Sequence, residues 1–193
     1  MAQVLDDLKP QKRSSVWLTW AGAALFASGL IHALIAGGTG ASWSGAVSMR
    51  KPVTFGISMG LALWTCGWII DRLPSRPRLE SALAWLLAGS GLIEVVLITV
   101  QAWRGVPSHF NFTTAADGAV FAVMGVMILM FVVAFVGLTI WAFVNRPADP
   151  STRLVVFAGM FLMLLGLGIG QWVINLGVEM AESLGHAPDT VTA

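Results

Sequence analysis

The segment from Gln101 to Asp117 holds the densest set of side chains in this chain that could do chemistry. It carries an amide, a guanidinium, an imidazole, a second amide and a carboxylate, at Gln101, Arg104, His109, Asn111 and Asp117. Together such groups can bind an anionic or carbonyl oxygen and move a proton. The sequence on either side is almost entirely apolar, so the segment should connect two long apolar helices.

Glu94 is the strongest single candidate for a functional residue, because it lies inside an apolar run. It precedes Gln101 by seven residues on the same helical face, about 10 Å deeper at 1.5 Å per residue. An ionisable side chain at that depth costs about 2.5–3.5 kcal/mol and by default marks a functional site. We expect a proton acceptor, a ligand or a counter-charge. The alternative is a buried carboxyl that hydrogen-bonds Gln101 or Ser90 for helix packing.

Two histidines, His32 and His109, are expected on the same side of the membrane as Glu94. They could act as acid and base, as a pair of haem ligands, or as metal ligands. The predicted catalytic set is therefore Glu94, His109 and His32. A metal ion, if bound, would take the same three residues, although no HxxxH or HExxH spacing supports one. The alternative is that both imidazoles simply bond loop backbone at the membrane surface.

Cations and amides should surround these groups. Arg50 and Lys51 precede the second apolar run and could hold a phosphate or carboxylate, or else reach the lipid headgroups. In the last apolar run, the amides Gln171 and Asn175 are four residues apart and therefore share a helical face. The predicted ligand-binding residues are Arg50, Lys51, Gln101, Arg104, Asn111, Asp117, Gln171 and Asn175.

Composition indicates that these residues belong to a membrane protein. The chain of 193 residues is 56% hydrophobic and only 11% charged, against about 25% charged in a soluble domain. Its net charge of +1 argues against nucleic acid as a partner. The single cysteine, Cys66, excludes an internal disulfide and a thiolate cluster.

Five apolar runs are long enough to span a bilayer, which needs about 20 residues. They predict an all-α, polytopic bundle of five transmembrane helices. A polar flank at residues 1–15 precedes a single transmembrane domain at 16–178, and a polar tail follows at 179–193. Asp149 should cap the last helix, and Thr114 with Asp117 should cap the one before it. The predicted helices cover residues 16–38, 53–70, 79–103, 118–144 and 154–178.

Lysine and arginine counts predict an inside N-terminus and an outside C-terminus. Eight of the 11 lie in segments that this orientation puts inside, whereas only Arg50, Lys51 and Arg104 lie outside. With this orientation, the position of each polar side chain along its helix puts nearly all of them in the outer halves of the helices. The inner halves offer only small neutral groups, so polarity is expected to be one-sided, with Glu94 at the floor of a pocket that opens outward.

The sequence thus predicts a multi-pass protein of the plasma (bacterial inner) membrane whose functional face is periplasmic or extracellular. It would bind an amphipathic molecule (a quinone, haem b or a lipid), as a membrane enzyme or redox subunit in which Glu94 handles protons. One alternative is a transporter or channel for small solutes, protons or ions, and another is a structural subunit of a larger complex. The lipid bilayer is the expected surrounding, with a homo-oligomer or a larger membrane complex as further expected partners.

Overall fold

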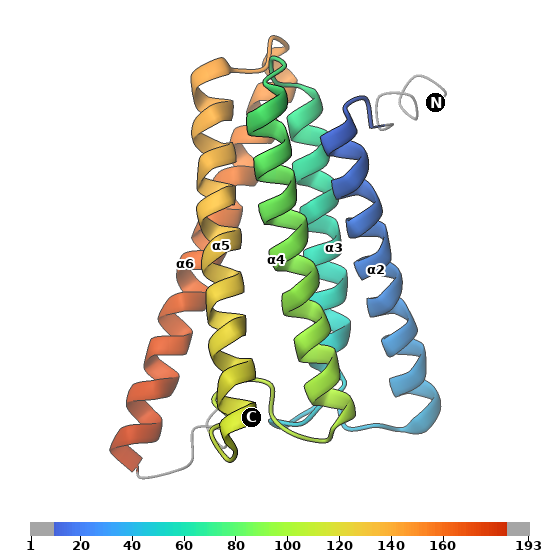
Figure 1. The fold of residues 1–193 in the computed structure, drawn as a ribbon, viewed down its shortest axis with the longest axis vertical. Helices are drawn as coiled ribbons and strands as arrows, with labels where there is room; N and C mark the ends of the chain where they lie inside the picture. The colour runs from blue at the N-terminus through green and yellow to red at the C-terminus, as the bar shows by residue number, and fades with distance from the viewer. Residues whose placement is uncertain (1–9, 185–193) are drawn as a thin grey trace.

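The computed structural model describes residues 10–184, which fold into a bundle of long helices with no strand in that range (Figure 1). All five are long and apolar enough to cross a membrane, as predicted. Each extends beyond its predicted bounds, because polar residues at the run ends continue the helix. The helices are α2 (Arg13–Thr39), α3 (Arg50–Asp71), α4 (Pro77–Trp103), α5 (Ala115–Asn145) and α6 (Pro150–Leu184).

The predicted outer boundaries move accordingly. The first helix begins at Arg13 rather than at residue 16, and the last continues to Leu184 rather than ending at residue 178. Most of the predicted N-terminal flank and the end of the predicted tail, residues 1–9 and 185–193, lie outside the described residues.

Helix termini follow the capping rules that the sequence indicated. The Thr114 hydroxyl accepts from the Asp117 N–H at 3.1 Å, and the Asp149 carboxylate accepts from the Thr152 N–H at 2.6 Å. Gly105 takes a left-handed φ of 69° directly after α4, which lets the chain turn away from the helix. These caps fix where α4 ends and where α5 and α6 begin.

The first two helices pack closest, and glycine makes this approach feasible. A methyl group on Gly22 would lie 2.6 Å from the carbonyl oxygen of Gly60, and one on Gly60 would lie 2.7 Å from that of Gly22. Only glycine fits such a backbone contact, as in other small-xxx-small helix pairs. Gly56 and Gly60 lie four residues apart on α3, and Gly60 meets Gly22 of α2 while Gly56 meets Gly29.

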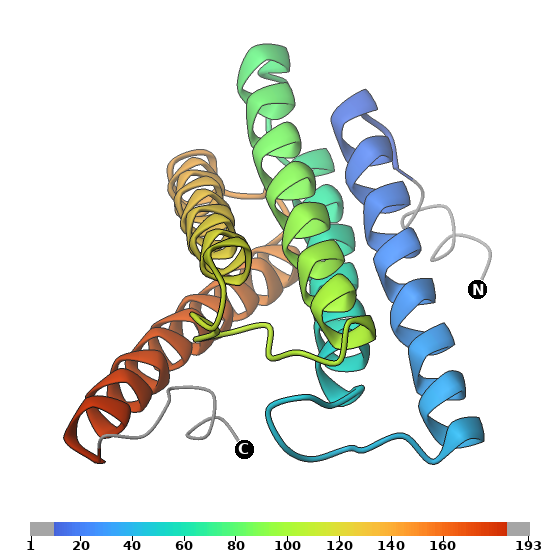
Figure 2. The ribbon, with the colours of Figure 1, turned by 60° about the horizontal axis from the view of Figure 1, so that its bottom comes forward.

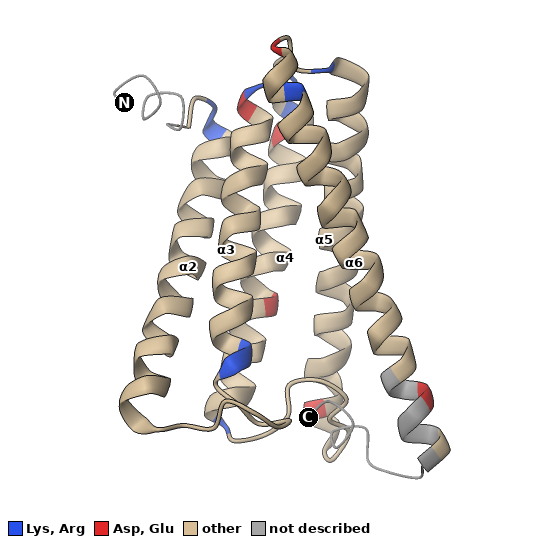
Figure 3. Ribbon diagram, turned by 180° about the vertical axis from the view of Figure 1, so that it is seen from behind, with Lys and Arg blue, Asp and Glu red and all other residues tan. Residues whose placement is uncertain are grey.

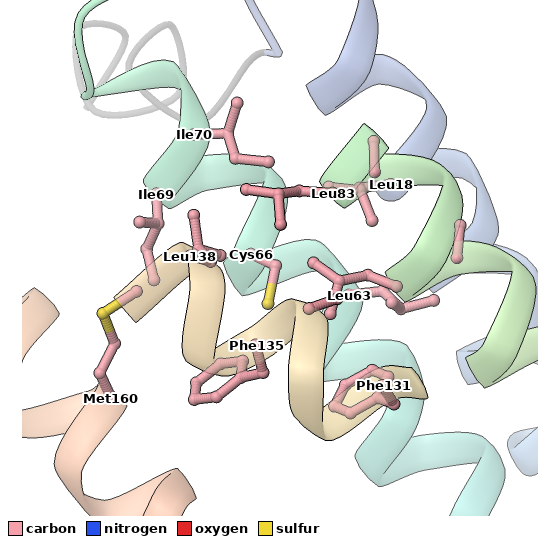
Figure 4. Close-up of a cluster of buried hydrophobic side chains, with 14 of the residues drawn as sticks. Leu18, Leu63, Cys66, Ile69, Ile70, Leu83, Phe131, Phe135, Leu138 and Met160 are labelled. Atoms are coloured by element: carbon pink, nitrogen blue, oxygen red, sulfur yellow. The ribbon is translucent and has the colours of Figure 1, made fainter. Parts of the chain in front are cut away.

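The centre of the bundle is an apolar core (Figure 4). Leu18, Leu63, Leu87, Phe131 and Leu138 are buried completely or almost completely, with 0–1% of their surface exposed. The core joins α2, α3, α4 and α5 and receives part of α6. Cys66 lies within it at 1% exposure, in keeping with an inert thiol.

The bundle has two different ends, named here for their shape (Figures 1 and 2). At the narrow end α2, α4 and α6 begin, and residues 72–76 and 146–149 connect helices. At the wide end α3 and α5 begin, residues 40–49 and 104–114 connect helices, and α6 diverges from the others. Charged side chains gather toward these two ends (Figure 3).

Candidate functional site

Three of the predicted site residues form a closed network at the wide end. The Asp117 carboxylate accepts from the Gln101 amide at 3.1 Å and from the Arg104 guanidinium at 2.7 Å, and Arg104 also donates to the Gln101 amide oxygen. Gln101 and Asp117 are 0% and 2% exposed. The network ties the last turn of α4 to the first turn of α5. Because its members satisfy one another, it serves to hold the site together.

Asn111 organises the connection between α4 and α5. Its amide donates to the carbonyl of Pro107 at 3.2 Å, and its side-chain oxygen accepts from the N–H and the hydroxyl of Thr113. Phe110, one residue before it, has φ of 57°, a left-handed conformation that costs a bulky residue free energy and is most common at functional sites. The predicted ligand-binding Asn111 therefore bonds its own loop.

His109 projects from this loop between two helices. Its ring lies 6.1 Å from the ring of Phe55 on α3 and 6.1 Å from that of Phe121 on α5, measured between centroids. The Ser108 hydroxyl bonds Nδ1 at 2.9 Å. Burial, and to a smaller extent the nearby Lys51 ammonium, lowers the pKa of His109 to about 4. The imidazole is therefore neutral at neutral pH and able to accept a proton.

Lys51 is a half-buried residue whose Nζ atom is buried and has no hydrogen-bond partner among residues 10–184. It lines a small space together with Ile98 and Ala102 of α4 and Ser108 of the loop. The hydroxyl of Ser48, which lines the same space, likewise has no partner in the described residues. The space that these residues enclose does not admit a molecule the size of water. The Nζ atom of Lys51 is thus buried where no water molecule fits beside it.

Glu94 is 4% exposed, and its Oε2 has no partner within the described part of the chain. Its depth follows from helix register. A methyl on Gly91 would lie 3.1 Å from Met59, so Glu94 is level with about Gly56 of α3. Lys51 lies five residues from that level, roughly 7.5 Å along the axis at 1.5 Å per residue.

The same reasoning relates Glu94 to His109. Gln101 faces Asp117 of α5, and Glu94 shares the helical face of Gln101, so Glu94 also faces α5. The α4–α5 register places Phe121, which contacts His109, about one turn nearer the wide end than Glu94. From the surface inward, the order is the closed network, then His109 and Lys51, then Glu94.

His32 belongs to a separate arrangement. Its Nδ1 lies 2.7 Å from the Ser28 carbonyl oxygen, and its Nε2 accepts from the Trp103 indole N–H at 3.0 Å. Both ring nitrogens are therefore engaged. No three His, Cys, Asp or Glu side chains in the described range come close enough to hold a metal ion, so His32, His109 and Glu94 do not form a joint ligand set.

Of the remaining predicted residues, Gln171 and Asn175 lie apart from this site, whereas Arg50 directly precedes Lys51. Gln171 and Asn175 are exposed on α6 and bond each other at 2.9 Å, where α6 diverges from the bundle. Helix periodicity puts two residues on one face but does not say which neighbour that face meets. Arg50 is the first residue of α3, half-buried, and its carbonyl accepts from Thr54.

The expectation of one-sided polarity was wrong, because the narrow end holds a buried polar cluster of its own. The Lys12 ammonium donates to the carbonyls of Ile70 and Leu73, both at 2.8 Å, and to the Glu80 carboxylate at 3.1 Å. Asp71 accepts from the N–H of Lys12 at 2.9 Å. These residues lie at the ends of apolar runs, and 68 residues separate Lys12 from Glu80, so no local pattern in the sequence indicates that they meet.

Comparison with known proteins identified no relationship: the chain matches no family model, no curated protein and no solved structure.

Proposed function

We propose that this membrane protein binds a small amphipathic molecule at the wide end and exchanges protons with it through Glu94 and His109. One observation carries the proposal. Lys51 Nζ and Glu94 Oε2 are buried without a hydrogen-bond partner in the described residues, while the network of Gln101, Arg104 and Asp117 beside them is complete.

Buried polar groups in native proteins nearly always have partners, and a buried charge without one costs several kcal/mol. Helix packing alone gives no reason to keep both the Lys51 ammonium and the Glu94 carboxyl buried without hydrogen-bond partners. A ligand that supplies the missing partners explains their retention, because its binding free energy offsets the cost of burying them.

The chemistry of these groups selects the ligand class. Lys51 can donate to a carbonyl or anionic oxygen, and Glu94 can accept from a hydroxyl group. The rings of Phe55, His109 and Phe121 offer aromatic surface between them. A quinone has this combination of carbonyl oxygens, a flat ring and an apolar tail. Its reduction consumes two electrons, supplied by a membrane redox partner, and two protons, which the Glu94 carboxyl passes on one after the other, taking each from solvent. The neutral His109 accepts a proton in the reverse direction, when a quinol is oxidised.

Ligand entry requires movement of the connecting loop, since the space around Lys51 is closed to water. The segment 104–114 carries both the wall at Ser108 and the ring of His109, so its displacement opens both together. The closed network at its two ends limits this movement to the middle of the segment.

The apolar core favours ligand binding over conduction. Leu18, Leu63, Leu87 and Phe131 lie between the two polar ends, and a permeating ion needs polar groups or water along its path.

Binding of a short-chain quinone to the purified protein tests the proposal. Titration calorimetry in detergent should show micromolar binding, weakened at least tenfold by Lys51→Met, which corresponds to about 1.4 kcal/mol. With an artificial electron mediator, Glu94→Gln should lose the proton uptake that accompanies quinone reduction and the proton release that accompanies quinol oxidation. Arg78→Gln, an exposed cation at the narrow end, is the control. No binding, or equal binding by Lys51→Met, would exclude the proposed site.

A second candidate function, as a subunit that assembles with other membrane helices, is favoured by α6. The amides of Gln171 and Asn175 are exposed on a helix otherwise rich in exposed apolar residues such as Val173. Amides in hydrocarbon gain from hydrogen bonds to another helix. Cross-linking of a cysteine placed at Asn175 in native membranes should then yield a defined product, and its absence counts against assembly through this face.

A further inference from the structure

A groove between α2 and α4 at the narrow end forms a second cavity, separate from the wide-end site. Its volume is about 580 Å³, within the range of roughly 300–1,000 Å³ typical of small-molecule sites. Most of its walls are apolar. Residues that line it include Arg13, Trp17, Trp20, Ala24, Trp85 and Gly89.

The shape of the groove suits a single hydrocarbon chain. Its floor consists of small residues, such as Ala21 and Ala88, which leave the space open. Three tryptophans stand along it, and the rings of Trp17 and Trp85 approach to 5.8 Å between centroids. A methyl group added to Gly89 would meet nothing within 4 Å, so the groove is unfilled at this point.

The length of the groove matches one leaflet of a bilayer. It runs along α2 from Arg13 to Ala24, which is eleven residues or about 16 Å at 1.5 Å per residue. Half of a hydrocarbon core of about 30 Å is about 15 Å. A chain lying in the groove would therefore reach from the membrane surface to the midplane, as a lipid tail does.

Charge at the mouth of the groove selects an anionic headgroup. Arg13 is exposed at the start of α2 and forms no ion pair among the described residues. The acidic side chain nearby, Glu80, is already paired with Lys12 at 3.1 Å. Arginine binds phosphate oxygens well, and basic residues beside a membrane attract anionic lipids.

We propose that the α2–α4 groove is a binding site for an anionic phospholipid, with one acyl chain along the tryptophans and the phosphate at Arg13. This site is independent of the proposed proton-exchanging site at the wide end. Phosphatidylglycerol is the probe of choice, because its headgroup is anionic, and phosphatidylcholine with the same chains is its zwitterionic counterpart.

Native mass spectrometry of the delipidated full chain, with equal amounts of the two lipids, tests the proposal. Phosphatidylglycerol adducts should exceed phosphatidylcholine adducts at least fivefold. Arg13→Gln should reduce this preference below twofold, whereas Arg78→Gln, an exposed arginine outside the groove, should keep it. Gly89→Leu should fill the groove and reduce both adducts, whereas Gly125→Leu, at a glycine that is equally unobstructed on α5, should not.

Unfolding midpoints measured in parallel show whether each variant is folded. If Gly89→Leu is not folded, Ala24→Leu fills the same groove from α2 and takes its place. Equal adducts of the two lipids on the unmodified chain, or a preference unchanged by Arg13→Gln, would overturn the assignment of the headgroup. Adducts unchanged by groove filling would overturn the site itself.

Discussion

The two ends of the bundle treat buried charge in opposite ways. At the narrow end, Lys12 and Glu80 are paired with each other, and Lys12 Nζ also reaches two backbone carbonyls. At the wide end, the Nζ atom of Lys51 and the Oε2 atom of Glu94 are buried too, but they lack hydrogen-bond partners within residues 10–184. Buried charges that have hydrogen-bond partners stabilise the fold. Buried charges without such partners stabilise it less and leave their polar atoms available to a ligand. This difference is the basis on which we propose a structural role for the narrow end and a ligand-binding role for the wide end.

Helix capping explains why the narrow-end cluster is complete. The carbonyls of Ile70 and Leu73 lie at the end of α3, where the last carbonyls of a helix have no intrahelical donor. Lys12 supplies that donor. Asp71 accepts from the N–H of Lys12, just before α2. The charges thus lock the end of α3 to the start of α2 and α4, and they would be needed in any state of the protein.

The largest expected effect is at the narrow end. Lys12→Met removes the ammonium from three acceptors and leaves the Glu80 carboxylate, 5% exposed, without its cation. Breaking one partner of a buried pair costs about 3–5 kcal/mol. We expect a loss of about 3 kcal/mol in the free energy of unfolding, because Lys12 keeps some exposure. Denaturation with SDS in mixed micelles measures it.

The matched substitution at the wide end is Lys51→Met. Since Lys51 Nζ has no partner in the described residues, its removal should leave stability unchanged or raise it. The exposed Arg78→Met controls for loss of a cation and should change stability by less than about 0.5 kcal/mol. Equal losses from Lys12→Met and Lys51→Met would show that the two ends do not differ.

An effect of at most similar size is expected from acid, and it should arise at the wide end. The pKa of His109 is lowered from 6.5 to about 4 in the folded protein, so the unfolded chain binds the proton more tightly. The stability that depends on neutral His109 is therefore present above pH 6.5 and lost as the pH falls toward 4. At 1.36 kcal/mol per pKa unit, the loss reaches roughly 3 kcal/mol as an upper bound.

Comparison of the unmodified chain with His109→Gln isolates this contribution, because the carboxylates titrate in both. Lys51→Met should diminish the acid sensitivity only in part, since burial is the larger cause of the lowered pKa. An identical pH dependence in His109→Gln and the unmodified chain would show that His109 is not held neutral by the fold.

The contrast between the ends also explains what sequence could predict. Five apolar runs suffice to predict the helices, because spanning length and hydropathy are local properties. The association of Gln101 with Asp117 was also predictable, since a short connection forces the end of α4 and the start of α5 together. The pairing of Lys12 with Glu80 depends on how distant helices pack, and no local pattern encodes it.

Sequence is limited in the same way when it is used to predict which neighbour a face of a helix will contact. Spacing correctly placed Glu94 on the face of Gln101, and that face meets α5 because Gln101 bonds Asp117. The spacing of Gln171 and Asn175 is equally regular, yet α6 diverges from the bundle and leaves them exposed. Periodicity gives the direction of a face relative to its own helix, and only a tertiary contact gives its neighbour.

A small effect on stability is expected for Glu94→Gln, and it gives the sharpest test of the comparison. The substitution keeps the volume of the side chain and removes a buried acid whose Oε2 has no partner in the described chain. We expect a change within about 1 kcal/mol, in either direction, because no formed interaction of Oε2 is lost. The matched Glu80→Gln, which breaks the pair with Lys12, should cost about 3 kcal/mol.

If Glu94→Gln proves as destabilising as Glu80→Gln, then Glu94 has a structural role and the wide end does not differ from the narrow end. A neutral Glu94→Gln that also abolishes proton uptake would instead show that the carboxyl is retained for its chemistry and not for the fold.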